Sequence, residues 1–494
     1  MFKKYFKEYK LIYPVCIFIS SFVLYILTMP RTVFWGDSGE LITAAYTLGI
    51  AHPTGYPLYI FLGKIFSLLP FGTIAFRLNM MSGFFGAMSA MMLYLTAYRL
   101  TKNKITGILS AALLSATPLF WEQSTLAEVY TLHIFLMLLG FYMLLRWSED
   151  HKIKWLYLFA LVYGLSFTNH LTSLVLLPAY AYLILLRTDN SSFRFNRIKI
   201  RTWIICILIF LLALTPYLYF PIRSSMDPVL DWGNTEHMGN FIMHITGERY
   251  QGQYAIAPDF KNGIIKLGSY LFSQYHILLA FLAVGLLTLN IKKDYKIALG
   301  LIAFFIIIFN LMYSIPDIGH YYLPLFVIIS FLTGFGIDWI LCFTRRFKPY
   351  AVGFVIIAII ISSFSMNTYL DKHDDYSARD YAISVFDRLD RNSVLLTNKD
   401  ENSVLWYFQF AEDMRKDVIV IPLVCIVYDY CVTQAFMQNY IVADSTFTPV
   451  GSLEIMPYIE DIKEKAVPRK TYYTDIFNYP DRDNPDTWKI KEVR

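Results

Sequence analysis

Asp37 is the side chain that the sequence best places to act as a general base. It lies within residues 35–40, Trp-Gly-Asp-Ser-Gly-Glu, directly after a long apolar run. A carboxylate at a membrane–water boundary, beside an aromatic residue and two glycines, can be partly desolvated and closely approached by a substrate. It could take a proton from an acceptor hydroxyl as that oxygen attacks the anomeric carbon of a sugar. One carboxylate is enough when the leaving group is a phosphate, whereas glycoside hydrolysis usually needs two.

The same segment also fits the start of a helix. Asp37 and Glu40 are three residues apart, as in a capping box, where two side chains satisfy the first N–H groups of a helix. Residues 41–48 have the apolar spacing of a short amphipathic helix lying on the membrane, and residues 50–57 end it. Helix capping and catalysis therefore both remain open for Asp37.

A second group of residues is expected to bind a sugar donor and its acceptor. Glu128 lies near a membrane boundary, where an ionisable residue is a functional candidate by default, although a glutamate there can also simply be solvated. Asn169 and His170 fall in a tight turn between two apolar runs, either as caps or as a polar wall. The remaining candidates are Trp35, Glu40, His52, Tyr56, Trp232, Asp317, His320 and Tyr322.

Arg223 is the first candidate to hold a phosphate, and Arg249 is the second. A guanidinium binds phosphate oxygens in a bidentate way, although an arginine at the interface can also simply reach lipid headgroups. Glu236, His237 and His244 could approach one another, but their spacing matches none of the usual metal-binding motifs. We therefore expect no metal.

These side chains require a membrane scaffold. The 494-residue chain is 56% hydrophobic and 16% charged, whereas soluble domains carry about 25% charged residues. A polytopic α-helical membrane protein of about eleven transmembrane helices is predicted over residues 1–368, because a span takes about 20 apolar residues. The expected spans are 11–29, 78–98, 104–120, 126–145, 155–170, 171–186, 202–221, 268–290, 297–314, 321–343 and 349–368.

Basic residues indicate the orientation. If the short apolar run 56–70 is interfacial or re-entrant, the loops on the N-terminal side carry 21 lysines and arginines and the opposite loops carry 7. Cytoplasmic loops are the basic ones, so the N-terminus is expected in the cytoplasm. The outer loops 30–77 and 222–267, which hold most candidate residues, and the C-terminal part are expected to be extracytoplasmic.

Residues 369–494 have the composition of a soluble protein and predict one small domain. Helical spacing over 377–389 and 401–412 alternates with strand patterns over 393–397 and 417–422. This order predicts a small α/β domain with a parallel pair of strands. Residues 455–494 are expected to be irregular. Cys425 and Cys431 could form a disulfide in an oxidising compartment, but their spacing leaves this open.

Two stretches resemble the signature of a membrane glycosyltransferase family. They are Trp-Gly-Asp-Ser-Gly-Glu-Leu at 35–41 and Gly-Ile-Ala-His-Pro-Thr-Gly-Tyr-Pro-Leu-Tyr at 49–59, and further similar stretches are 127–130, 168–170, 219–223, 231–233 and 317–324. The family was long catalogued as a domain of unknown function, and its animal member is an endoplasmic-reticulum protein O-mannosyltransferase acting on plexin-type receptors. The resemblance implies a GT-C architecture, with an acidic residue early in the first outer loop.

The resemblance also implies a polyprenyl-phosphate sugar as donor and co-substrate, with no other cofactor. The expected activity is transfer of a sugar, mannose first among the possibilities, to a hydroxyl of a protein (serine or threonine) or a glycan. The lipid bilayer is the expected surroundings, a bacterial inner membrane the first expected location, and nucleic acid is not an expected partner.

A membrane transporter or lipid-sugar flippase without transferase activity is the alternative. Such proteins place charges near the middle of spans and often contain repeats, whereas here the polar residues gather on one face. A scaffold without catalysis also stays open, but it would leave the two long outer loops unexplained.

Overall fold

Seven helical segments of the described chain are long and apolar enough to cross a membrane, and a bent helix pair raises this number to eight. The computed structural model describes residues 2–189, 192–254, 258–315, 317–343, 357, 370–397, 399–422, 468–474, 488 and 490–492. The long segments are α1 (Phe2–Thr28), α4 (Ile74–Thr101), α7 (Tyr130–Asp150), α10 with η2 and α11 (Ile200–Ser224), α14 with η3 and α15 (Phe260–Thr288), α16 (Lys293–Met312), and α17 with α18 (Ile318–Phe343). The chain is a multi-pass integral membrane protein.

Ten of the eleven expected spans fall on helices of the described chain, and eight of these are long enough to cross a membrane if the bent pair counts as one span. Seven match the long segments, and the span expected at 104–120 is the bent pair of α5 (Lys104–Ala116) and α6 (Pro118–Thr125), which meet at 67°. The spans expected at 155–170 and 171–186 are shorter apolar helices, α8 (Lys154–Phe167) and η1 with α9 (Leu171–Leu185). The span expected at 349–368 lies outside the described residues, apart from residue 357.

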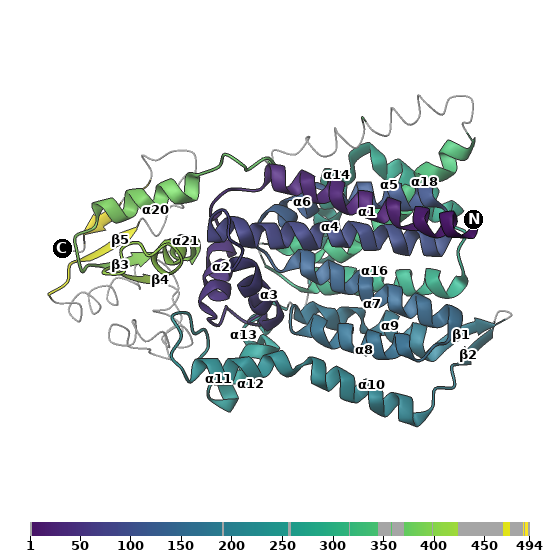
Figure 1. Ribbon diagram of the computed structural model, residues 1–494, viewed down its shortest axis with the longest axis horizontal. Helices are drawn as coiled ribbons and strands as arrows, with labels where there is room; N and C mark the ends of the chain where they lie inside the picture. Colours follow the sequence, from purple (N-terminus) through teal and green to yellow (C-terminus); the bar gives the residue numbers. More distant parts are fainter. Residues whose placement is uncertain are drawn as a thin grey trace.

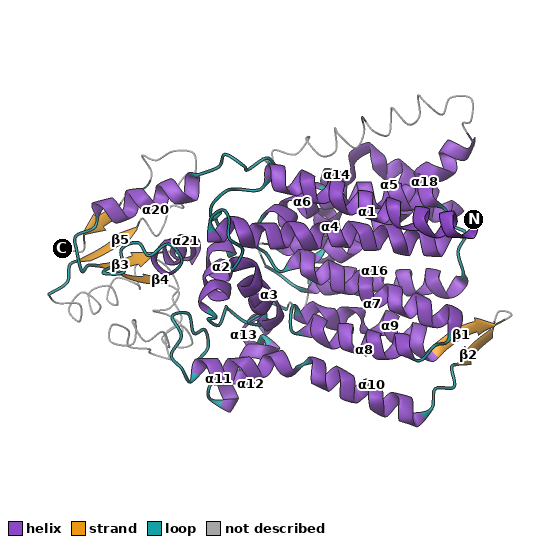
Figure 2. Cartoon of the chain, in the orientation of Figure 1, coloured by secondary structure: helices purple, strands orange, loops and turns teal. Residues whose placement is uncertain are grey.

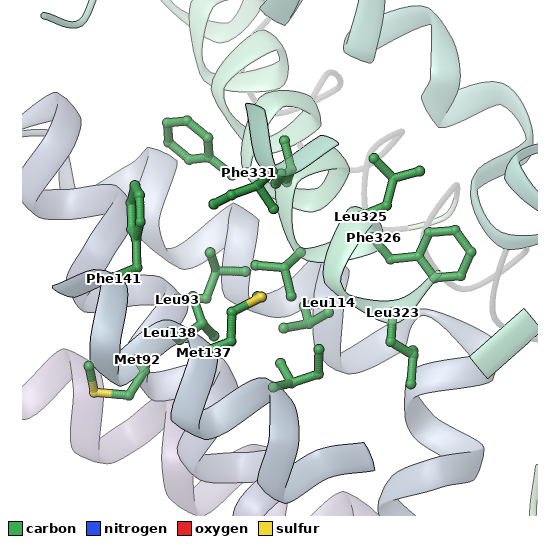
Figure 3. Close-up of a cluster of buried hydrophobic side chains, with 14 of the residues drawn as sticks. Met92, Leu93, Leu114, Met137, Leu138, Phe141, Leu323, Leu325, Phe326 and Phe331 are labelled. Carbon is green, nitrogen blue, oxygen red and sulfur yellow. The ribbon is translucent and has the colours of Figure 1, made fainter. Parts of the chain in front are cut away.

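The helices run side by side as one bundle, with α4 among its inner members (Figure 1). Figure 3 shows part of the core, where Met92 and Leu93 of α4 lie near side chains of α7 and α18. Glycines allow the closest contact, between α15 and α18. A Cβ on Gly285 would lie 2.0 Å from the carbonyl oxygen of Leu332, and one on Gly336 would lie 2.0 Å from that of Phe281. Small residues permit such close backbone approach in membrane proteins.

Strands lie at both ends of the bundle (Figure 2). At one end, β1 (Leu186–Asp189) and β2 (Ser192–Phe195) form a hairpin. At the other end, the C-terminal part contains α20 (Ser377–Arg388), α21 (Lys399–Phe410) and a four-stranded sheet of order β4-β3-β5-β6. The strands are β3 (Val394–Thr397), β4 (Ile419–Pro422), β5 (Thr471–Thr474) and β6 (Ile490–Glu492).

The strand–helix–strand unit predicted in the tail is confirmed. Strands β3 and β4 are parallel, with Val394 opposite Ile419, and α21 connects them. The expectation that 455–494 is irregular is wrong for β5 and β6, because β5 pairs in parallel with β3 and β6 pairs with β5. This pairing joins residues about 75 positions apart, so no local pattern indicates it. Cys425 and Cys431 lie outside the described residues.

Helix α2 (Ser38–Thr47) lies between the bundle and the C-terminal part. It contacts α3 (Pro57–Ser67) and α4 on the bundle side and α21 on the other. Residues Ser38 to Ala45 are all buried. The prediction of a helix here is confirmed, and α21 covers the face of α2 that points away from the bundle.

Candidate active site

Asp37 precedes the first turn of α2 but does not cap it. Its side chain accepts no capping hydrogen bond from the helix, and its backbone carbonyl receives the amide of Leu41 at 2.9 Å. The side chain is 32% exposed, in a neighbourhood where most residues are buried. Of the two readings that the sequence left open, capping therefore does not explain Asp37, and the carboxylate stays accessible for chemistry.

Glu40 and His52 form a buried pair beside Asp37. Oε1 of Glu40 accepts the backbone N–H of His52 at 2.7 Å and lies 3.0 Å from its Nδ1. Glu40 is 1% exposed, so it is not the partner in a capping box. A carboxylate can only accept, so this contact holds the Nδ1 proton on the imidazole and leaves Nε2 as the acceptor when the ring is neutral.

The other edge of the His52 ring faces two oxygen atoms. Nε2 lies 3.1 Å from the hydroxyl of Tyr56 and 3.8 Å from Oδ2 of Asp37. Glu40, His52, Tyr56 and Asp37 thus form a connected group in which Glu40 fixes the ring and Nε2 faces the exposed carboxylate. The arrangement can orient a proton acceptor and can share the proton that Asp37 receives.

Backbone pairing fixes the loop that carries His52. Ile50 forms a parallel bridge with Asp231, and its amide donates to the carbonyl of Leu230 at 2.7 Å. The carboxyl of Asp231 is held by Ser224 Oγ at 2.9 Å, and burial raises the pKa of Asp231 to about 6. Gly55 has φ +84°, and a Cβ there would lie 2.3 Å from the ring of Phe220. A side chain at this position would therefore clash and strain the loop.

Aromatic and imidazole rings pack beside this group and form a wall, which consists of Tyr56, Tyr130, His170, His320 and Tyr321. The ring of His170 lies 6.1 Å from Tyr56, 5.5 Å from Tyr130 and 5.6 Å from Tyr321, measured between centroids. Tyr130 in turn lies 5.1 Å from His320. Burial, followed by the repulsion of a neighbouring imidazole, lowers the pKa of His170. The imidazole of His170 is therefore neutral near pH 7, and the wall offers hydrogen-bonding edges and ring faces, which suit a sugar.

Glu128 lies close to the same group. Together with Asp37 it raises the pKa of Tyr56 further above its usual value, after burial and two neighbouring tyrosines, Tyr321 and Tyr250. Its backbone is held by Ser82, whose hydroxyl receives the Glu128 amide at 3.2 Å. Asn169 is fully buried and donates to the carbonyl of Val129 at 3.1 Å, so it positions the segment that contains Glu128.

Arg223 donates hydrogen bonds to backbone carbonyls at the C-terminal end of α2. Its Nε donates to the carbonyl of Leu48 at 2.7 Å, and Nη2 donates to that of Thr47 at 3.4 Å. A guanidinium at this position satisfies carbonyls that the helix leaves open and favourably meets the negative end of its dipole. Trp232 is buried, and its amide donates to Ile50 at 3.4 Å, so it supports the His52 loop.

Arg249 lies in α13 (Glu248–Gln251), which follows α12 (Met238–Thr246). It is half-buried, and the next residue, Tyr250, lies near Tyr56.

Three expected site residues lie at other contacts. Trp35 donates from Nε1 to Ser377 Oγ at 2.9 Å, and so faces the C-terminal part. Tyr322 packs on Tyr270 at 5.9 Å, while its neighbour Tyr321 joins the wall. Asp317 is exposed at the start of α17 (Ile318–Tyr321).

The sequence reasoning missed several members of the wall. Tyr130 and Tyr321 belong to quoted motifs, but neither was chosen, because a sequence does not show which aromatic side chains lie beside His170. Gln123, whose Nε2 lies 3.1 Å from Nε2 of His320, was also missed. Another omission is the ion pair of Lys372 with Glu122 at 3.3 Å, which joins the start of the tail to the bundle.

One group in the described part of the chain could geometrically hold a metal ion. The ligand atoms of Asp37, Glu40 and His52 lie within 4.8 Å of one another. Oε1 of Glu40 is already engaged by the amide of His52 and lies beside its Nδ1, whereas Oε2 of Glu40 is buried without a hydrogen-bond partner in the described structure. His237 is 69% exposed whereas His244 is buried, so these two do not combine into the site considered from the sequence.

Comparison with known proteins supports the resemblance seen in the sequence. Residues 37–193 match a family model described as the Protein O-mannosyl-transferase TMEM260 N-terminal domain. Protein O-mannosyl-transferase tmem260 of Dictyostelium discoideum is 29% identical over 472 residues, which cover 83% of this chain and 57% of that protein. Protein O-mannosyl-transferase TMEM260 of Mus musculus is 26% identical over 449 residues, covering 84% and 63%. The match thus spans about three-fifths of each relative.

Among solved structures, the chain is similar to that of ArnT from Cupriavidus metallidurans bound to undecaprenyl phosphate. The TM-score is 0.59 and the sequence identity 12%, over 93% of both chains. At this identity the similarity shows the fold. The predicted fold, a GT-C-like helical membrane protein with a small C-terminal sheet, is confirmed.

Proposed function

We propose that this chain, a relative of the TMEM260 family with the fold of ArnT, is a glycosyltransferase. It moves a sugar, with mannose as the first to test, from a polyprenyl phosphate to a hydroxyl of a protein. Two findings support the choice of substrates. The curated relatives are named as protein O-mannosyl-transferases, and the ArnT structure contains undecaprenyl phosphate.

The geometry around Asp37 is the observation that carries the proposal. A partly exposed carboxylate without a capping role stands 3.8 Å from an imidazole that a buried glutamate orients. Purely structural carboxylates are usually buried and paired or fully solvated. The carboxylate of Asp37 lies beside the imidazole of His52 and is 32% exposed, so a substrate can reach it, as a general base requires.

The reaction needs one base. Asp37 takes the proton of the acceptor hydroxyl while that oxygen forms a bond to C1 of the sugar. The bond from C1 to the phosphate oxygen breaks, and the electron pair leaves with the polyprenyl phosphate. A single displacement of this kind inverts the anomeric centre. Glu40 keeps Nε2 of His52 as an acceptor, and this nitrogen lies near enough to Asp37 to take up the proton after Asp37 has removed it from the acceptor hydroxyl.

The remaining candidates divide between the two substrates. We propose that Tyr56, His170 and His320 of the wall bind the hydroxyls of the sugar, together with Glu128. Arg223 and Arg249 remain the candidates for the phosphate, and the guanidinium of Arg223 also bonds two carbonyls at the end of α2. Trp35 and Tyr322 are better explained by packing.

The proposal places this site on the extracytoplasmic face. The excess of basic residues on the opposite side of the bundle supports this orientation, with the N-terminus in the cytoplasm. It divides the chain into a catalytic membrane part, 1–368, and a C-terminal part, 369–494, on the same side as Asp37. Contacts of α21 with α2 and of Lys372 with Glu122 fit this division.

Asp37→Asn tests the function. The purified full chain would be incubated with polyprenyl-phosphate mannose and a serine- and threonine-rich peptide, and the released polyprenyl phosphate measured. Loss of a general base typically costs about 10²–10⁴-fold in rate, so Asp37→Asn should retain about 1% of turnover or less. Asp227→Asn, an exposed carboxylate in the 222–267 loop, is the control. Full activity of purified, folded Asp37→Asn would remove the proposed base.

A further inference from the structure

Two cavities adjoin one another at the end of the bundle opposite Asp37. Helix α7 spans both regions, because Tyr130 at its start joins the candidate active site and Trp147 near its end lines the first cavity. Seventeen residues of α-helix are about 26 Å long. The two places are therefore separated by most of the thickness of a bilayer, which is about 30 Å in its hydrocarbon part.

The first cavity is basic. Its volume is about 770 Å³, and it lies where the end of α7, the start of α8, strand β2 and the start of α10 meet. Its lining includes His151, Arg194, Arg197 and Lys199, and the described residues that line it include no aspartate or glutamate. Asn196 and Thr202 add polar groups, and Trp147 adds an aromatic ring of the kind common at membrane interfaces.

The second cavity is apolar and continues the first. It has a volume of about 360 Å³ and lies between α8, α9 (Leu177–Leu185) and α10. Leu156, Ile198 and Thr202 line both cavities, so the two join at these residues. The outward side chains of α10, such as Ile204 and Leu208, are more than half exposed, as expected where a helix faces lipid.

We propose that the two cavities together bind one anionic glycerophospholipid. Its phosphate headgroup occupies the basic cavity, near Arg194, Arg197 and Lys199, and an acyl chain occupies the apolar groove along α10. Each volume lies within or near the range of small-molecule sites, about 300–1,000 Å³. Basic pockets between transmembrane helices attract anionic headgroups. A soluble anion would leave the apolar groove unexplained, and an uncharged lipid would leave the basic lining unexplained.

Such a lipid would fix the start of a span that ends at the candidate active site. Helix α10 continues through η2 (Thr215–Leu218) into α11 (Tyr219–Ser224), and Arg223 of α11 bonds the carbonyls that end α2. The binding site itself does not depend on the proposed function, because it lies on other residues and can be measured without a sugar.

Lipid binding to the purified full chain tests whether the basic cavity binds the headgroup. Native mass spectrometry would count phosphatidylglycerol and phosphatidylcholine adducts of the wild type and of Arg197→Gln/Lys199→Gln. The double variant should bind phosphatidylglycerol about 30-fold more weakly, which corresponds to about 2 kcal/mol for two basic residues near a headgroup. Lys104→Gln/Arg201→Gln is the matched control. Both its residues are exposed at the same end of the bundle, and neither lines the cavity.

Photo-crosslinking tests the acyl-chain half. Phosphatidylglycerol with a diazirine in its acyl chain should label residues 156–163 and 198–210 above the rest of the protein. Ala181→Phe, which fills the groove, should reduce this labelling at least severalfold. Equal binding of the two lipids, equal loss in the control variant, or uniform labelling would overturn the proposal. Displacement of the lipid by a lower concentration of polyprenyl phosphate would also overturn it, since the groove would then hold the donor.

Discussion

Gly39→Ala should separate α21 from the helix that follows Asp37. Gly39 is the second residue of α2, and α21 crosses it so closely that a Cβ would lie 2.3 Å from the carbonyl oxygen of Ser403 and 2.6 Å from its carbon. These are backbone atoms, so no rotation of a side chain relieves the clash. One of the two helices has to move by about 1 Å to restore ordinary contact distances.

The cost follows from this overlap. Overpacking of a well-packed contact costs about 1–3 kcal/mol. Helix α2 stays helical in both the docked and the open state, so the helix propensity of alanine does not offset this cost. A loss of about 1–3 kcal/mol corresponds to a shift of about 5- to 150-fold in the equilibrium between docked and open α21. Backbone amides of Lys399–Phe410 should exchange with deuterium faster by the same factor.

Hydrogen exchange and sugar transfer would be measured on the same preparation. Gly239→Ala is a matched control, because Gly239 is also the second residue of its helix, α12, and a Cβ there meets nothing within 4 Å. Unchanged exchange over Lys399–Phe410 in Gly39→Ala would refute the close approach of the two helices. Faster exchange with full transferase activity would show that the docked tail does not position Asp37.

Three further predictions concern the site itself. Glu40→Gln should lower kcat by at least tenfold and reduce the free energy of unfolding by about 1–3 kcal/mol. The reason is that the charged group that accepts hydrogen bonds from His52 becomes neutral. Unchanged turnover and Tm would contradict this role. Asp231→Asn should raise Tm at pH 7.5 but hardly at pH 4. Burial raises the pKa of Asp231 from about 3.9 in the unfolded chain to about 6, so the folded state loses stability as pH rises between these values, by about 3 kcal/mol at most. Asp227→Asn, at an exposed position, should show no such pH dependence. Transfer should persist in EDTA, and a requirement for added Mg²⁺ or Mn²⁺ would instead indicate that Asp37, Glu40 and His52 hold a cation.

Local sequence patterns were sufficient to predict the helices of the bundle and part of the C-terminal sheet. The apolar runs indicated the spans because a helix in lipid must satisfy its own backbone, and this leaves a long uninterrupted signal. The parallel pair β3 and β4 was predictable because both strands and the helix between them are continuous in sequence. The same reasoning failed for β5, whose partner β3 lies about 75 residues earlier.

In the candidate active site, too, residues close in sequence could be predicted and contacts between distant residues could not. The motif around Asp37 was recognisable because its residues are adjacent. Whether Asp37 capped a helix depended on side-chain rotation, and the structure shows no capping bond. Trp35 was expected at a substrate, yet its partner is Ser377, which is 342 residues away. A sequence cannot indicate contacts at such separations without the fold.

The sequence by itself thus determined a helical membrane protein with an acidic residue at one face, because hydrophobicity and local spacing are properties of neighbouring residues. Only the tertiary structure decided that Glu40 orients His52 toward Asp37, that Tyr321 rather than Tyr322 joins the wall, and that α21 covers α2. These depend on which distant surfaces pack together, and packing is settled by the shape and burial of the whole chain.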